Sequence, residues 1–134
     1  MKRIFVDTSA LLALEDESDV HHAEALRFRD QVLFKGNYEL ITTSYILDET
    51  LTRRRLGIRE SIALSKKIRA SRILKSISVS GETEEKALDL FEKYDDKTFS
   101  FTDCVSFVAM HGMQIREAFA FDDHFSQMGF QRKP

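Results

Sequence analysis

Acidic residues stand at positions where a folded chain could gather them into one site. Asp7 directly follows a short apolar run, and Asp122 and Asp123 follow another one near the carboxyl end of the chain. Glu49 and Asp103 lie in segments whose apolar residues recur at helical spacing. Carboxylate oxygens are hard ligands that suit Mg²⁺ or Mn²⁺. Four of these acids, brought together, would form a divalent-metal site.

Each acid also has a purely structural explanation. Asp7 and Asp103 suit the first turn of a helix, where a carboxylate interacts favourably with backbone N–H groups. Glu49 stands four residues before Arg53, the spacing of a helical ion pair. Consecutive aspartates at Asp122 are typical of a turn. The site interpretation is favoured because all of these acids border apolar segments instead of lying on charged surfaces.

Strand-like and helix-like segments alternate along the chain, and they must position these acids. Such alternation predicts an α/β fold, with a mostly parallel sheet and helices on both of its faces. In such sheets the functional crevice lies beyond the carboxyl ends of the strands, which is where the acids stand. The expected strands cover 4–6, 38–42, 73–80 and 118–121, with an edge strand near Phe130, and the expected helices cover 8 onward, 19–35, 43–56, 58–70, 82–94 and 102–113.

Length and composition are those of one ordinary globular domain spanning residues 1–134. The chain has 43% hydrophobic and 31% charged residues, which is far from the composition of disordered chains. Its apolar runs fall short of the ~18 residues that span a bilayer. The single cysteine, Cys104, has no partner for an internal disulfide and is expected to serve in packing. We therefore expect a cytoplasmic protein without a membrane segment.

Positive charge is concentrated in the segment 53–75, which has nine Lys or Arg and a single acid, Glu60. This segment could be a solvated helical face or a surface that binds a nucleic-acid backbone. Among the histidines, His21 and His22 are expected to be solvated and His111 to lie in the core. His124, beside the acids, is a candidate for phosphate contact.

Four segments in this order, VDTSALLAL, SYILDETLTRRR, SFTDCVSFVAM and AFAFDDHF, resemble the PIN domain. Within that family they resemble the VapC type of toxin ribonuclease from prokaryotic toxin–antitoxin pairs, over essentially the whole chain. The resemblance implies a three-layer α/β/α fold and cleavage of RNA with Mg²⁺ or Mn²⁺. It also implies a cognate antitoxin that covers the site, and a homodimer as a common state.

The resemblance also implies roles for individual residues. Its catalytic and metal-binding acids correspond to Asp7, Glu49, Asp103 and Asp122, and its supporting residues to Thr8, Ser9 and Thr102. Arg53, Arg54 and Arg55 begin one helical turn after Glu49, so we expect one or two of them to contact the RNA backbone.

Some alternatives stay open at this level. Asp48 and Asp123 are neighbours that could replace Glu49 and Asp122, and Glu49 could be a metal ligand or could orient the attacking water. Ala120 stands where the family often has Thr or Ser.

Two rival functions are a PIN-like module that only binds nucleic acid or a partner, and an aspartyl phosphatase of the haloacid dehalogenase kind. The phosphatase needs an Asp two residues after the first, where this chain has Ser9.

Overall fold

A computed structural model describes residues 1–52 and 56–134, and its centre is a five-stranded sheet. The strand order is β3-β2-β1-β4-β5, and every neighbouring pair is parallel. The predicted α/β fold is therefore confirmed. The strands are β1 (Lys2–Val6), β2 (Tyr38–Thr43), β3 (Leu74–Ile77), β4 (Glu117–Phe119) and β5 (Gln131–Lys133).

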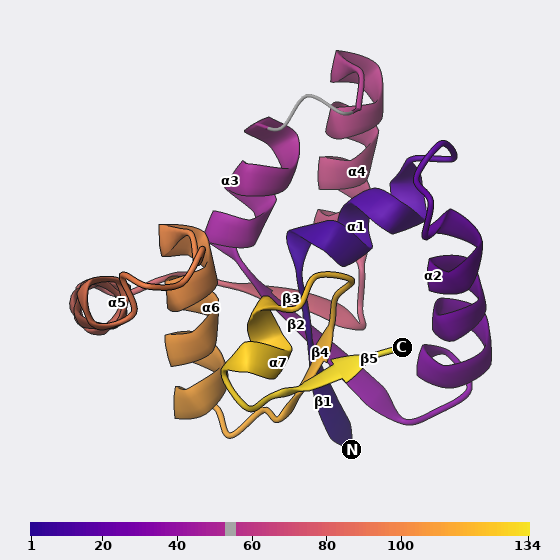
Figure 1. Ribbon diagram of the computed structural model, residues 1–134. Helices are drawn as coiled ribbons and strands as arrows, with labels where there is room; N and C mark the ends of the chain where they lie inside the picture. The colour runs from indigo at the N-terminus through magenta and orange to yellow at the C-terminus, as the bar shows by residue number, and fades with distance from the viewer. Residues whose placement is uncertain (53–55) are drawn as a thin grey trace.

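Helices cover both faces of this sheet (Figure 1). Helices α1, α2 and α4 lie toward one face together with a π-helical segment, η1, while α5, α6 and α7 lie toward the other (Figure 1). Their bounds are α1 (Thr8–Glu15), α2 (His22–Phe28), η1 (Arg29–Leu33), α3 (Ser44–Thr52), α4 (Ile58–Ala70), α5 (Gly81–Lys93), α6 (Phe101–Gly112) and α7 (His124–Gln127). No helix in the described ranges is long and apolar enough to cross a membrane.

Strand β1 is central and has no solvated face over its last residues. Ile4, Phe5 and Val6 are each at most 1% exposed. The Phe5 ring packs against Phe125 of α7, with 6.1 Å between centroids, whereas Val6 faces the side that α1 and α4 cover. This two-sided burial explains the uninterrupted apolar run before Asp7, which is typical of parallel strands.

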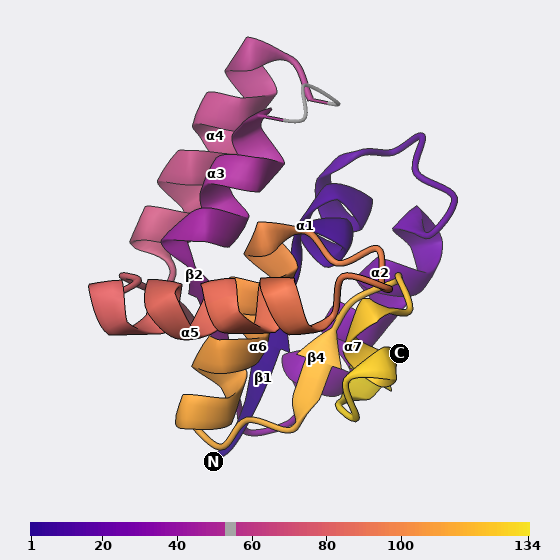
Figure 2. The same cartoon turned by 60° about the vertical axis from the view of Figure 1, so that its left-hand side comes forward.

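Helices α3 and α4 lie side by side and extend beyond the sheet (Figure 2). Helix α3 starts directly after β2, where the backbone N–H of Ile46 donates to Thr43 Oγ1 at 3.2 Å. Helix α3 carries Glu49 to Thr8, two residues after the end of β1, because Glu49 Oε2 lies within hydrogen-bond distance of the Thr8 hydroxyl.

Several predicted boundaries differ from the structure. The helix expected over 19–35 begins at His22, because the Asp19 carboxylate accepts from the backbone N–H of His21 at 2.8 Å and holds a turn there. Its last part is the π-helical η1. The strand expected over 73–80 is shorter, Leu74–Ile77, and forms the sheet edge, so fewer residues are held by a neighbouring strand.

Candidate functional site

Asp7 lies at the carboxyl end of β1 and caps α1. The side chain is 3% exposed, and its Oδ2 accepts from the backbone N–H of Ser9 at 3.2 Å and from Ser9 Oγ at 2.7 Å. Ser9 Oγ in turn accepts from the backbone N–H of Phe121 at 3.0 Å. Ser9 therefore links the first acid to the segment that follows β4, one residue before Asp122.

Asp103 belongs to a capping box at the start of α6. Its Oδ2 accepts from the backbone N–H of Ser100 at 2.9 Å, and its own N–H donates to Ser100 Oγ at 3.0 Å. The residue is 6% exposed, and its Oδ2 lies 2.8 Å from Nδ1 of His124. The spacing of Ser100 and Asp103 is a recognisable helix-start signature, so this contact could have been predicted from the sequence. The contact with His124 had no such signal.

Glu49 reaches the same region from α3. Its Oε2 accepts a hydrogen bond from the hydroxyl of Thr8 at 3.1 Å, and Thr8 directly follows Asp7. Thr50 Oγ1 lies 3.2 Å from the same Thr8 hydroxyl and 2.7 Å from the carbonyl oxygen of Ile46. Asp48 is exposed on the outer side of α3. The geometry therefore favours Glu49 over its neighbour.

Asp122 lies at the rim of the acid group. Its side chain is 38% exposed, and its Oδ1 accepts from the backbone N–H of His124 at 3.2 Å. The Asp123 side chain is 80% exposed and pairs with Arg132 at 3.6 Å. Asp123 is thus directed to solvent and to the last strand, whereas Asp122 acts electrostatically on both Asp7 and Asp103.

Burial and mutual repulsion perturb the two inner acids. The pKa of Asp7 is raised to about 7, chiefly by burial and then by the charge of Asp122, with a smaller contribution from Asp103. The hydrogen bonds from Ser9 oppose this increase. Burial also raises the pKa of Asp103. The Ser100 N–H and His124 oppose that increase, whereas Asp122 and Glu49 add to it. These four acids from four elements therefore share one electrostatic environment.

Their donor chemistry fits a hard divalent cation, because each offers carboxylate oxygens. In the described ranges, however, no three His, Cys, Asp or Glu side chains lie together closely enough to hold one ion. The carboxylates of Asp7 and Asp103 are instead engaged with Ser9, Ser100 and His124. The acids are gathered, but they do not form a ready-made metal cage.

The remaining predicted site residues lie nearby or outside the described chain. Thr102 is half-buried, and its carbonyl oxygen accepts from Ser106 Oγ at 3.0 Å, so a supporting role for its hydroxyl stays a prediction. Arg53, Arg54 and Arg55 lie outside the described residues.

The histidine predictions need correction. His111 is exposed and does not lie in the core. His21 and His22 are half-buried and so only partly solvated. The His21 ring stacks on Phe121 at 4.4 Å between centroids, and His22 Nδ1 lies 2.7 Å from the carbonyl oxygen of Ala13. These predictions fail because tertiary contacts decide which side chains near a helix end are buried, and the spacing of apolar residues in the sequence does not show those contacts. Cys104 is fully buried, as expected for packing.

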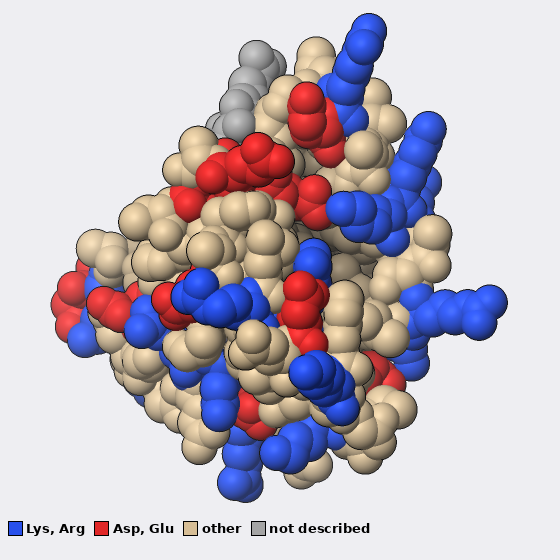
Figure 3. Space-filling view, turned by 90° about the vertical axis from the view of Figure 1, so that its right-hand side faces the viewer, with Lys and Arg blue, Asp and Glu red and all other residues tan. Residues whose placement is uncertain are grey.

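Part of the basic segment is already paired with acids. Lys67 Nζ lies 2.9 Å from Glu15 Oε1, and Lys75 Nζ lies 3.3 Å from Glu39 Oε2. On the face shown in Figure 3, Lys and Arg side chains project from several separate places, and they do not form one continuous patch. A phosphate-binding role for the segment 53–75 stays a prediction.

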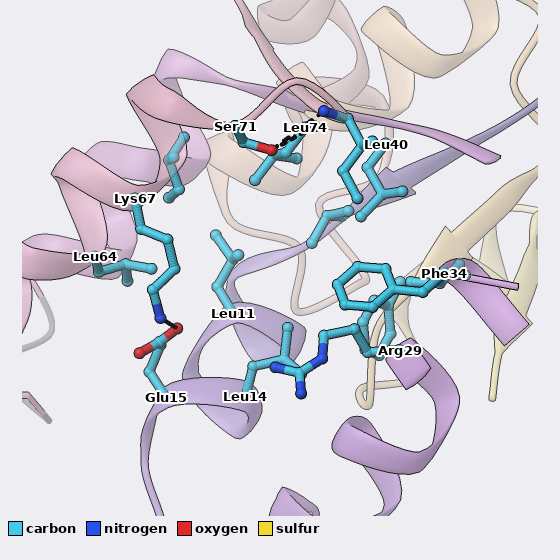
Figure 4. A pocket seen from close by; sticks show the side chains of 15 residues that line it. Leu11, Leu14, Glu15, Arg29, Phe34, Leu40, Leu64, Lys67, Ser71 and Leu74 are labelled. Carbon is cyan, nitrogen blue, oxygen red and sulfur yellow. Dashed lines mark hydrogen bonds and ion pairs between the residues drawn. The ribbon is translucent and has the colours of Figure 1, made fainter. Parts of the chain in front are cut away.

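An apolar pocket of about 200 Å³ lies between α1, η1 and α4 (Figure 4). Leu11, Leu14 and Leu64 line it, and the Lys67–Glu15 ion pair lies at one side (Figure 4). Its lining offers hydrophobic contact and none of the four acids, so this pocket is distinct from the acidic site.

A buried parallel sheet with carboxylates gathered at its carboxyl end is the arrangement that the PIN resemblance implied. A family model described as the PIN domain matches residues 4–131. This chain therefore belongs to the PIN domain family.

Its curated relatives are ribonucleases by name. The chain is 36% identical over 130 residues to the 23S rRNA-specific endonuclease VapC20 of Mycobacterium tuberculosis, covering 95% of each chain. It is 28% identical over 122 residues to the VapC ribonuclease of Archaeoglobus fulgidus, covering 90% of this chain and 78% of that protein. The predicted VapC-type ribonuclease function is thereby supported, in preference to a phosphatase.

Solved structures agree on the fold. The crystal structure of VapC20, described as a Sarcin-Ricin loop cleaving toxin, matches with a TM-score of 0.85 and 34% identity over 95% of each chain. VapBC2 from Rickettsia felis, bound to a promoter DNA fragment, matches with a TM-score of 0.66 at 9% identity, over 98% of this chain and 97% of that one. The first match confirms the predicted three-layer α/β/α architecture, and the second concerns the fold alone.

Proposed function

We propose that this protein is a VapC-type endoribonuclease that hydrolyses RNA phosphodiester bonds in the cytoplasm with the help of Mg²⁺ or Mn²⁺. One observation carries the metal dependence: Asp7 and Asp103, far apart in sequence, are both buried, and the charge of Asp122 contributes to the raised pKa of each. Burying like charges together is unfavourable. A divalent cation among them offsets that repulsion.

The acids then have distinct roles. A bound cation supplies an activated water and neutralises charge on the phosphate. Asp7 and Asp103 would be its chief ligands, after small rotations of their side chains, and Asp122 at the rim would be a further or water-mediated ligand. Glu49, held by Thr8, would complete the ligand set or orient the attacking water.

Ser9 and Thr102 would support this site. Ser9 fixes the carboxylate of Asp7 through two hydrogen bonds, which limits how far that side chain can rotate. Arg53, Arg54 and Arg55 remain the proposed contacts to the RNA backbone, because they follow Glu49 within one or two helical turns of sequence.

We infer that the substrate is a structured ribosomal RNA. The relative with 36% identity over 95% of each chain is named as specific for 23S rRNA, and a solved structure of it is described as cleaving the Sarcin-Ricin loop. Incubating purified ribosomes with the protein and mapping new RNA ends by primer extension tests this substrate class. A single dominant cut in the large-subunit RNA supports it, and cuts scattered over every RNA offered would contradict it.

A cognate antitoxin is the proposed protein partner, and a homodimer is the proposed state of the free protein. The pocket of Figure 4 offers an antitoxin segment apolar contact beside α1, the helix that Asp7 caps. Light scattering on the purified protein measures its oligomeric state. A molar mass equal to one chain at micromolar concentration would rule out a stable dimer.

Metal-dependent cleavage distinguishes this proposal from a PIN-like module that only binds. The expected result is cleavage of ribosomal RNA in Mn²⁺, none in EDTA, and a loss of at least about 100-fold in rate for Asp103→Asn. Asp123→Asn, which changes an exposed acid one residue from the site, should cleave normally. Binding of RNA without cleavage in either metal would favour the inactive module.

A further inference from the structure

His124 is the residue through which two acid-bearing segments contact each other. Its Nδ1 lies 2.8 Å from Asp103 Oδ2 and 3.9 Å from Asp122 Oδ1, and its own backbone N–H donates to Asp122 Oδ1. One residue of α7 therefore touches both the third and the fourth acid.

The imidazole ring is held in place from its other side. Its Nε2 lies 3.3 Å from Thr98 Oγ1, and the ring packs edge-on against buried Phe99, with 5.6 Å between centroids. Thr98 and Phe99 belong to the segment that leads into α6, so the ring joins that segment to the one after β4. Its side chain is 25% exposed, while Nδ1, which lies beside the acids, is buried.

The contact engages one particular oxygen of Asp103. The Ser100 N–H donates to Oδ2, and His124 Nδ1 lies within 2.8 Å of the same oxygen. Among the described residues, Nδ1 has no hydrogen bond of good geometry, so its 2.8 Å approach to Oδ2 is a close polar contact. Together these partners fix the rotation of the carboxylate and leave Oδ1 for another ligand.

We propose that His124 is a positioning residue, which orients Asp103 toward the cation and holds the Asp122 segment beside it. This inference rests on the proposed metal-dependent function. Groups that orient metal ligands from behind typically change metal affinity by about 10–100-fold when removed. His124 does not itself contact the substrate in this account.

The test distinguishes the effect of the His124 nitrogen atoms from the effect of its aromatic ring. His124→Phe keeps an aromatic ring against Phe99 but removes both nitrogens, whereas His124→Asn keeps an N–H donor near the position of Nδ1. Mn²⁺ affinity is measured by calorimetry on both variants and on the wild type, and the melting temperature in EDTA monitors folding.

The expected result is that Mn²⁺ binding weakens about 10–100-fold in His124→Phe and stays within about threefold of wild type in His124→Asn. Excess Mn²⁺ should then restore most of the cleavage rate of His124→Phe. Wild-type Mn²⁺ affinity in His124→Phe, or an equal loss in both variants, would overturn the positioning role. A wild-type protein that binds no Mn²⁺ would contradict the proposed function itself.

Discussion

At the scale of single residues, burial makes ionisation of the Asp7 carboxyl group unfavourable. Its pKa of about 7 in the folded state lies above the ordinary value of 3.8, because burial and the neighbouring acids disfavour the charged form. A group with a raised pKa stabilises the fold fully below its unfolded value, and this contribution is lost as pH rises through the folded value. The metal-free protein should therefore lose stability between about pH 4 and pH 7 through this residue.

Asp7→Asn should remove that pH dependence, because the amide does not ionise. The free energy of unfolding, measured by urea denaturation in EDTA, should favour the variant over the wild type by more at pH 8 than at pH 5, with a difference of a few kcal/mol at most. Parallel pH profiles for the two proteins would show that Asp7 ionises as easily folded as unfolded.

Ser9 should matter more than a similar serine elsewhere. Ser9→Ala removes the hydrogen bond to buried Asp7 and the acceptor of the Phe121 N–H, which should lower the free energy of unfolding by about 1–3 kcal/mol. Ser18 makes the same pair of contacts to Asp16, but on the exposed surface. Ser18→Ala should cost less than about 0.5 kcal/mol. Equal losses in the two variants would refute the structural role given to Ser9.

Sequence alone could place the acids but not all their partners. The sequence pattern shows that Asp7 and Asp122 follow apolar strands. It does not show that Asp48 and Asp123 are exposed. The contact of His124 with Asp103 joins segments whose packing depends on the whole fold. Such contacts leave no local signal in the chain.

At the scale of elements, the start of α6 is both a helix cap and part of the site. Ser100→Ala removes the cap of Asp103 N–H and should lower the free energy of unfolding by about 1 kcal/mol, or the melting temperature by roughly 3–5 °C. Loosening this first turn also weakens the backbone hydrogen bond from Ser100 to Asp103 Oδ2, so Mn²⁺ affinity should fall as well.

Ser80 provides the matched control for this prediction. It caps α5 in the same way, accepting from the Thr83 N–H at 3.2 Å, on an exposed helix. Ser80→Ala should cost similar stability and leave Mn²⁺ affinity unchanged. If both variants bind Mn²⁺ like the wild type, the capping box serves folding alone.

Element types could be predicted better than element ends. The short apolar runs and helical periodicities identified the sheet strands and most helices, because the spacing of apolar residues reflects which faces of an element are buried. The start of α2 depends on the turn at Asp19, and the edge position of β3 depends on strand order. Both are set by contacts between elements.

At the scale of the whole molecule, a sheet covered on both faces brings distant acids to one edge. Residue Val6 of β1 stands opposite Phe119 of β4, so Asp7 and the segment leading to Asp122 leave the sheet side by side. Alternation of strands and helices predicted this class of fold. The strand order, however, is a choice among several arrangements that satisfy the same pattern, and only the packed core selects one.

The central claim is that these acids gather to hold a divalent cation, and the most direct test is the melting temperature with and without Mn²⁺. At about 100 times its dissociation constant, Mn²⁺ should stabilise the wild type by about 2.7 kcal/mol, or roughly 8–14 °C. Asp103→Asn, which removes a ligand and a repelling charge, should show no such increase. No increase in the wild type, or the same increase in Asp103→Asn, would contradict the claim.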